Sequence, residues 1–166
     1  MTGVFTLFGV WLANRSSLKQ LTIKLDYESK KEVREVERVR LEELYSLTSN
    51  WAKLFVIHHT RYRKVMKGEL TYNEALDLEL ANSSTIDANR MFTLAELYFP
   101  SAHEALQDLN QLLNEASSIQ NSFKKIYKEG QSTSEKHAKG LTEVLLRFNT
   151  AVEIYKKLLA AYAKSV

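Results

Sequence analysis

The four histidines are the residues of this chain that are best suited by type to catalysis or metal binding, and they are His58, His59, His103 and His137. A di-iron site in a helical bundle needs a glutamate three residues before a histidine on two helices, and none of the four has one. The segment from His103 and Glu104 begins as a zinc-protease helix does, but Gln107 stands where the second histidine must be. The sequence therefore predicts no metal site and no cofactor.

The sequence also lacks the usual motifs for nucleophilic catalysis and for phosphate binding. The chain has no cysteine, which removes disulfides and thiolate chemistry and favours a reducing compartment. The sequence contains no Gly-x-Ser-x-Gly elbow and no glycine-rich phosphate loop. Adjacent acids such as Glu42 and Glu43 face different directions on a helix and lie among basic neighbours, so they are expected to be solvated surface residues. We therefore expect no catalytic residues and a protein that is not an enzyme.

The stretch HHTRYRKVMKG, residues 58–68, is the candidate nucleic-acid patch. Tyr62 could stack on a base, but its spacing places it on the apolar face of a helix. His58 lies on the same face and is expected to be partly buried and hydrogen-bonded. Nucleic-acid binding is therefore disfavoured.

Charge alternates along the chain, although the net charge is only +3. Residues 1–67 carry 13 basic side chains against 7 acidic ones, and residues 124–166 carry 9 against 4. Between them, residues 68–123 carry one basic side chain against 9 acidic ones. This alternation suits neighbouring antiparallel helices better than one continuous basic face.

Long helices are the elements expected to position these side chains. The 166 residues suffice for one domain with a sizeable core, and five glycines with one proline are too few for a turn-rich sandwich or barrel. From residue 41 to 67, mostly apolar residues recur at steps of three and four, the period of one helix face. They are Leu41, Leu44, Thr48, Trp51, Phe55, His58, Tyr62 and Val65. Gly68 is expected to end this helix.

Three further helices are predicted, over residues 71–98, 101–129 and 136–164. Capping-box spacing occurs at Thr71 and Glu74, and again at Ser101 and Glu104 behind the helix-breaking Pro100. An apolar stripe in the first of these helices includes Leu76, Leu80, Met91, Leu94 and Tyr98. Its middle, residues 81–89, is poor in large side chains, which favours close packing at Ala81, Ser84 and Ala88 over a kink or a polar contact surface. Phe123 and Phe148 lie on clear stripes and are expected in the core.

Helices of nearly equal length joined by short connections pack antiparallel. We therefore predict an all-α fold, an antiparallel bundle of three or four helices with coiled-coil packing and an extended N-terminal helix. The expected organisation is an apolar segment at 1–14, a charged helical stalk at 15–40 and the bundle at 41–166. Within the stalk, Val33 and Val36 contribute to a thin apolar seam that ends at Val39.

The apolar segment contains no charge from residue 3 to residue 13. Its candidate membrane-anchoring residues are Val4, Phe5, Leu7, Phe8, Val10, Trp11 and Leu12. This stretch is shorter than the about 20 residues that span a bilayer core, but Trp11 suits a membrane interface, and Arg15 and Lys19 follow as the positive-inside rule expects. A cleaved signal peptide is disfavoured because no basic residue precedes the stretch. The alternative is that the segment packs within an oligomer or against a partner.

Three stretches, GVFTLFGVWLANR, RVRLEELYSLTSNW and LAELYFPSAHEAL, resemble a loose class of small bacterial and phage proteins. Members of that class are single-span, membrane-anchored proteins with a cytoplasmic helical bundle. The resemblance implies a location at the bacterial inner membrane, with the bundle on the cytoplasmic side. It carries no catalytic residues to this chain.

These features favour a non-enzymatic, membrane-tethered helical module that interacts with a protein partner. One alternative is a cytoplasmic regulatory, immunity or phage accessory protein whose apolar N-terminus is buried in a homo-oligomer or against a partner. A second alternative is an effector that perturbs membranes. Membrane fractionation separates the first two hypotheses, and toxicity on overexpression identifies the third.

Overall fold

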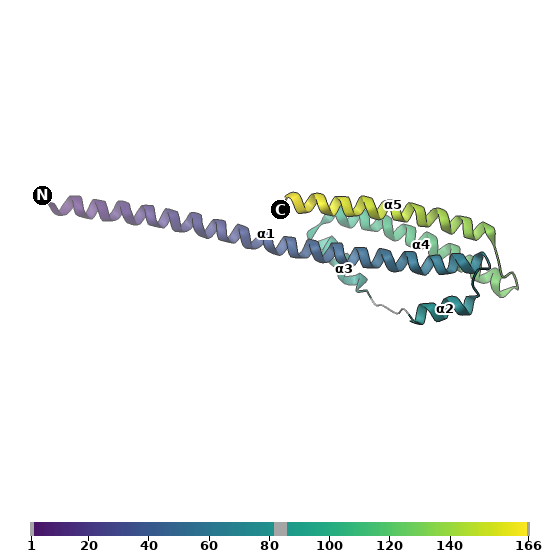
Figure 1. The fold of residues 1–166 in the computed structure, drawn as a ribbon. Helices are drawn as coiled ribbons and strands as arrows, with labels where there is room; N and C mark the ends of the chain where they lie inside the picture. Colours follow the sequence, from purple (N-terminus) through teal and green to yellow (C-terminus); the bar gives the residue numbers. More distant parts are fainter. Residues whose placement is uncertain (1, 82–85, 166) are drawn as a thin grey trace. The chain divides into compact units, whose positions relative to one another are not determined.

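The computed structural model describes the backbone of residues 2–81 and 86–165, and the side chains of residues 15–81 and 86–164. All regular structure in these ranges is helical (Figure 1). The helices are α1 (Thr2–Met66), α2 (Tyr72–Ala81), α3 (Ala88–Tyr98), α4 (Pro100–Lys128) and α5 (Glu135–Ser165). The predicted all-α class is confirmed, and α1, with 65 residues, is the longest of these helices.

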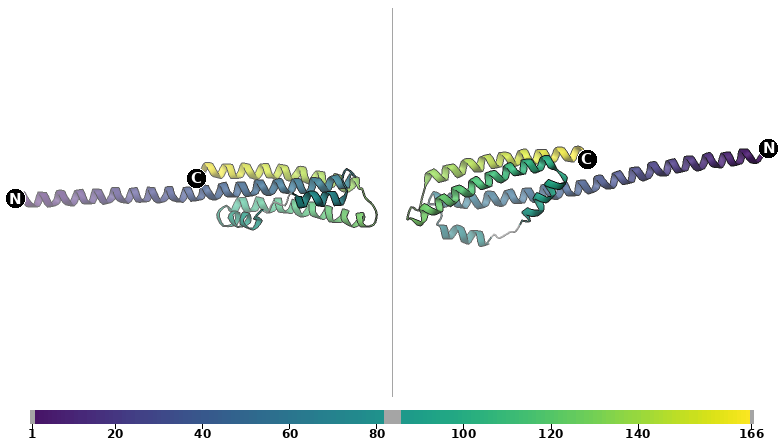
Figure 2. Two further views of the ribbon diagram at one scale, coloured as in Figure 1. Left: turned by 60° about the horizontal axis from the view of Figure 1, so that its bottom comes forward. Right: turned by 180° about the vertical axis from the view of Figure 1, so that it is seen from behind.

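The chain divides into two units, one reaching to Val39 and one from Arg40 to Ser165. The second unit is an antiparallel bundle of four passes, in which α2 and α3 together form the second pass (Figures 1 and 2). Helix α4 packs against both α3 and α5. The predicted antiparallel bundle is therefore present, with one of its passes divided.

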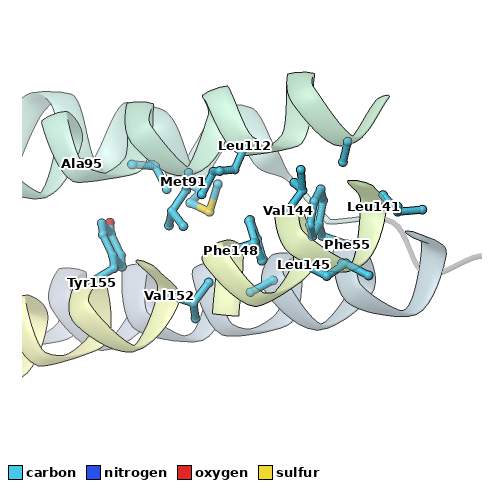
Figure 3. Close-up of a cluster of buried hydrophobic side chains, with 14 of the residues drawn as sticks. Phe55, Met91, Ala95, Leu112, Leu141, Val144, Leu145, Phe148, Val152 and Tyr155 are labelled. Atoms are coloured by element: carbon cyan, nitrogen blue, oxygen red, sulfur yellow. The ribbon is translucent and has the colours of Figure 1, made fainter. Parts of the chain in front are cut away.

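Aromatic stacking joins the first and last passes of the bundle. The rings of Phe55 in α1 and Phe148 in α5 stack with centroids 3.9 Å apart, and Trp51 packs against Phe148 at 5.6 Å. Figure 3 shows Phe55, Met91 and Phe148 gathered in the space between the helices. Phe123 and Phe148 are both fully buried, as predicted.

The apolar face predicted from residue 41 to residue 65 is confirmed. Six of its residues are buried, and these are Leu41, Leu44, Thr48, Phe55, Tyr62 and Val65. Trp51 and His58 are partly buried. A period of three and four residues therefore identified the side of α1 that faces the core.

Gly68 ends α1, as predicted, and its conformation requires glycine. Its φ of +76° lies in the left-handed region, and a Cβ added there would approach Cγ2 of Thr133 to 2.9 Å. The amide of Ser134 donates to the carbonyl oxygen of Met66 at 2.7 Å. This bond fastens the connection before α5 to the end of α1.

The capping box at the start of α2 is also confirmed. The amide of Glu74 donates to Oγ1 of Thr71 at 3.2 Å, and the amide of Thr71 donates to Oε2 of Glu74 at 2.7 Å. These bonds to Thr71 hold the pKa of the Glu74 carboxyl below its ordinary value. Thr71 and Glu74 thus define where the second pass begins.

The single helix predicted over residues 71–98 is wrong, because the chain leaves the helical conformation before Asp87. Oδ1 of Asp87 accepts from the amide of Arg90 at 2.8 Å and caps a new helix, α3. The close packing predicted at Ala81 is also wrong, since Ala81 is exposed, while Ala88 is half-buried. The third residue of that prediction, Ser84, lies outside the described residues.

The capping box predicted at Ser101 and Glu104 is wrong as well. Helix α4 begins at Pro100, with Phe99 as its N-cap, so Ser101 already lies inside the helix. Proline suits a first helical position because its fixed φ is helical and the amide it lacks would have no helical partner there. Pro100 therefore starts the helix that it was expected to precede.

Helix α2 buries little of its own surface. Ala75 is its buried residue, while Leu76, Leu78 and Leu80 are exposed. The predicted stripe through Leu76 and Leu80 therefore fails to mark the inner side of α2. The helix is instead attached through Ala75 and through polar and aromatic contacts described below.

In the first unit, the described side chains from Arg15 to Val36 are all exposed. Ion pairs within the helix link neighbouring turns, as between Lys30 and Asp26 at 3.0 Å and between Arg38 and Glu35 at 3.1 Å. Each exposed pair of this kind contributes only about 0.3–0.5 kcal/mol. Local pairs are therefore a modest source of stability for this part of α1.

Candidate functional site

The predicted membrane-anchoring residues, from Val4 to Leu12, lie on the helical backbone of α1. Their side chains lie outside the described residues, so the anchor stays a prediction. Within the described part of the chain, no helical stretch has the length and apolar character needed to cross a bilayer.

A second candidate is the polar cluster around His58, which joins three helices. Nδ1 of His58 lies 2.6 Å from Oε1 of Glu79 in α2, and Nε2 lies 3.1 Å from Oε1 of Gln120 in α4. The Tyr62 hydroxyl donates to Oε2 of Glu79 at 3.2 Å. The prediction of a partly buried, hydrogen-bonded His58 is confirmed.

Aromatic rings extend this cluster along α2. Tyr72 of α2 contacts Tyr62 of α1 and Tyr127 of α4, each with ring centroids 5.4 Å apart. Tyr62 is buried, as its place on the apolar face predicted, and is not available to stack on a nucleic-acid base. Burial, together with the charge of Glu79, raises the pKa of the Tyr62 hydroxyl above its ordinary value of 10.0.

His59 is buried more deeply than His58 and packs edge-on against Phe55, with ring centroids 4.4 Å apart. Its Nδ1 has no hydrogen-bond partner among the described residues. Burial, and secondarily the neighbouring His58, lowers the pKa of His59 from 6.5 to about 4. His59 is therefore a neutral core side chain at neutral pH.

The contacts of this cluster are structural, because they attach α2 to the rest of the bundle. Glu79 is hydrogen-bonded to His58 and Tyr62 of α1. Gln120 of α4 contacts the second ring nitrogen of His58. No group of three histidine, aspartate or glutamate side chains within residues 15–81 and 86–164 is arranged to hold a metal ion. Its observed contacts position α2 against α1 and α4.

The other two histidines are also engaged in local bonds. Nε2 of His103 lies 2.8 Å from Nε2 of Gln107, the residue at the position of the missing zinc ligand. His137 contacts Oγ of Ser134 at 2.7 Å and Oγ of Ser122 at 3.1 Å. The second of these contacts links α5 to α4.

A third candidate is an open groove of about 580 Å³ between α4 and α5. It is lined by Asp108, Gln111, Leu112, Glu115, Leu146, Arg147, Thr150, Ala151 and Ile154. Leu146 and Ile154 are 64% and 62% exposed, although both side chains are large and apolar. Nη1 of Arg147 donates to both carboxylate oxygens of Glu115, at 2.9 and 3.0 Å.

The groove places two large exposed apolar side chains, Leu146 and Ile154, among charged and polar ones. Leu146 and Ile154 are eight residues apart on α5, which places them about 12 Å apart along the helix axis. The sequence analysis missed this site because it depends on how α4 and α5 face each other. One signal was available, since both residues are large, apolar and off the core stripe of the last helix.

Comparison of the chain with protein-family models, curated proteins and solved structures finds no match.

Proposed function

We propose that the chain is a non-enzymatic helical interaction module, held at a membrane by residues 3–13, whose bundle binds a protein partner. The observation that carries the proposal is the unbroken helical backbone of α1 from Thr2 to Met66. It makes an uncharged segment of eleven residues continuous with the first pass of the bundle. Such a helix would link a membrane-bound segment to the bundle without an intervening loop.

Burial of the segment would provide the binding energy. Removing each large apolar side chain from water contributes roughly 1.5–3 kcal/mol, and the segment has seven such side chains. Arg15 and Lys19 follow it and suit the anionic, cytoplasmic side of a membrane. These charges support a bundle on the cytoplasmic side, and the resemblance to small bacterial membrane-anchored proteins implies the bacterial inner membrane as the proposed location.

The groove between α4 and α5 supports the interaction role. Single exposed apolar residues are common on protein surfaces. Two exposed apolar residues that line the same groove instead form a candidate binding surface for apolar side chains of a partner. Leu146 and Ile154 are eight residues apart, a spacing that occurs on one broad apolar face of a helix, so an apolar face of a partner helix would suit them. The partner itself is a protein of unknown identity.

A cytoplasmic regulatory, immunity or phage accessory protein is the second candidate function. The exposed apolar residues of α1 between Leu18 and Val39 favour it, because they suit an oligomer. In that case, residues 3–13 would be buried between chains instead of in lipid.

Replacing Phe8 by arginine should move the full-length protein from the membrane fraction to the soluble fraction. A charge at the centre of the segment weakens insertion by about 2.5–3.5 kcal/mol. Flotation with vesicles of anionic and zwitterionic lipid measures the change. Ser17→Arg is the matched control, since it adds the same charge at an exposed position beyond the segment; it should leave flotation with zwitterionic vesicles unchanged and should not lower flotation with anionic ones.

Deletion of residues 1–14 completes the test. The truncated chain should lose flotation while its bundle melts at nearly the same temperature, because the core residues among the described side chains all lie beyond Arg40. If the deletion unfolds the bundle or dissociates an oligomer, the segment is part of a protein core and the second candidate function gains support. Full-length protein that is soluble and monomeric without detergent would contradict the tether.

A further inference from the structure

Helix α1 carries an apolar face between residues 18 and 39 that is open to solvent. Its large side chains are Leu18, Leu21, Leu25, Val33, Val36 and Val39, which are between 42% and 64% exposed. At 3.6 residues per turn, all six point within about 60° of one direction. Thr22 and Ser29 also fall on this face, and Glu32 is its charged member between residues 18 and 39.

A helix exposed on every side is marginal in water, because most helical stability in proteins comes from packing an apolar face. The described ion pairs within this stretch are exposed and contribute little, as noted above. A partner that covers the face from Leu18 to Val39 would provide the missing packing. The charges beside the face indicate which partner fits.

Four charged residues line each edge of the apolar face. In chain order, one edge carries Lys19, Asp26, Lys30 and Glu37, and the other carries Lys24, Glu28, Lys31 and Glu35. Along both edges the charges therefore follow the order positive, negative, positive, negative, and corresponding residues of the two edges lie between about 1.5 and 7.5 Å apart along the helix axis. Because of this charge pattern, two copies of the face attract each other when the helices are antiparallel and repel each other when they are parallel.

We infer that this face pairs with the same face of a second copy of the chain, antiparallel, with the two-fold axis near Glu28 and Ser29. In an antiparallel pair, each edge faces the same edge of the other copy. Lys19 then lies level with Glu37 of the second copy, and Asp26 lies level with Lys30. Glu32 lies level with Lys24, so the charge within the face also meets an opposite charge.

The second edge behaves in the same way. Lys24 and Glu35 of the two copies, and likewise Glu28 and Lys31, lie level to within about 5 Å along the axis. The apolar layers also match, because Leu18 and Leu21 of one copy lie opposite Val36 of the other. Larger side chains thus meet smaller ones across the contact.

A parallel pair in register is disfavoured by the same charges. Each edge would then face the opposite edge of the second copy, so that Lys19 meets Lys24 and Asp26 meets Glu28. Further along, Lys30 meets Lys31, and Glu37 meets Glu35. Like charges across helices are destabilising, which is how coiled coils select their orientation.

The antiparallel arrangement also bears on the proposed tether, although it does not rest on it. Residues 1–14 of the two copies would extend from opposite ends of the paired stretch. Only one of the two segments could then enter a given flat bilayer. Pairing through this face and attachment of both copies to one membrane would therefore compete.

Charge reversal in the full-length protein tests the pairing. Lys19→Glu and Glu37→Lys should each weaken the dimer about tenfold, because each turns two attractive contacts into repulsive ones. The double variant should return to within about twofold of the parent. Residues 19 and 37 lie about 27 Å apart in one helix, so restoration can come only from contacts between copies.

Sedimentation equilibrium in one fixed non-ionic detergent measures these affinities, and circular dichroism checks that helix content is unchanged. Arg34→Glu is the matched control, because it reverses a charge on the side of the helix away from the apolar face, and it should leave the affinity unchanged. Tighter association of Lys19→Glu would indicate a parallel pair and overturn the proposal. A monomer at every accessible concentration, or a face that binds only vesicles, would also overturn it.

Cysteine cross-linking gives an independent readout, because the chain has no cysteine of its own. Ser29→Cys lies near the two-fold axis and should form a disulfide between copies. Thr22→Cys should not link to itself but should link to Val33→Cys when the two variants are mixed, since residues 22 and 33 lie level in the antiparallel pair. Linking of Thr22→Cys to itself would contradict this arrangement, because disulfides need Cα atoms within about 7 Å.

Discussion

Replacing Phe148 by alanine should lower the free energy of unfolding of the bundle by about 3–5 kcal/mol. The ring is fully buried, stacks on Phe55 and contacts Trp51, so it joins α5 to α1. Its removal deletes apolar contacts and leaves a cavity between two passes. Urea unfolding followed by circular dichroism measures the change.

Two further variants show whether this cost belongs to the core. Phe123→Ala should cost a similar amount, because Phe123 is also fully buried. Leu146→Ala, two residues from Phe148 on α5, should change stability by less than about 1 kcal/mol, since Leu146 is 64% exposed. Equal, small effects at all three positions would show that the apolar stripes do not form the core.

Acidification from pH 7.5 to pH 5 should lower the stability of the bundle by about 2 kcal/mol through His59. The pKa of His59 falls from 6.5 to about 4 on folding, chiefly through burial and further through His58. The unfolded chain therefore takes up a proton at higher pH than the folded chain does. The stability is fully present above pH 6.5 and is lost as the pH falls toward 4.

His59→Leu should remove this dependence, because leucine has similar bulk and does not titrate. Urea unfolding at a series of pH values measures the slope for each variant. Leu109→Ala is the control, since it weakens the buried core without altering a titratable group, and it should keep the slope of the parent. An unchanged slope in His59→Leu would assign the acid sensitivity to other groups.

The sequence predicted best the features that depend on neighbouring turns of one helix. The face from Leu41 to Val65 and the burial of Phe123 and Phe148 follow from helical periodicity. Gly68 and the bonds between Thr71 and Glu74 follow from local backbone chemistry. Such features need no knowledge of what another helix does.

The errors concern choices between two plausible local structures. Asp87 can lie within a helix or cap one, and the chain uses it as a cap. Ser101 with Glu104 has capping spacing, but Pro100 provides an earlier start. For α2, leucines at 76, 78 and 80 do not indicate which side faces inward, because α2 buries Ala75 and meets α1 through the carboxylate of Glu79.

The candidate sites could not be predicted in full either, because they depend on contacts between different helices. His58 could be expected to form hydrogen bonds, but its partners Glu79 and Gln120 lie 21 and 62 residues away in sequence. The groove at Leu146 and Ile154 requires α4 and α5 to lie side by side. Helical periodicity identifies the side of one helix that is apolar, and it does not identify the neighbour.

Helix α2 should be the part of the bundle whose backbone amides exchange with solvent deuterium before those of α4 and α5. Its attachment rests on Ala75, on the contacts of Glu79 with His58 and Tyr62, and on the rings around Tyr72. Few buried apolar contacts mean a small free energy of local opening. Glu79→Gln should accelerate exchange within Tyr72–Ala81 while leaving exchange in α5 unchanged, as mass spectrometry of peptides would show. Helix α2 would then open locally while α3, with its buried Met91, Leu94 and Ala95, and the other passes stay folded.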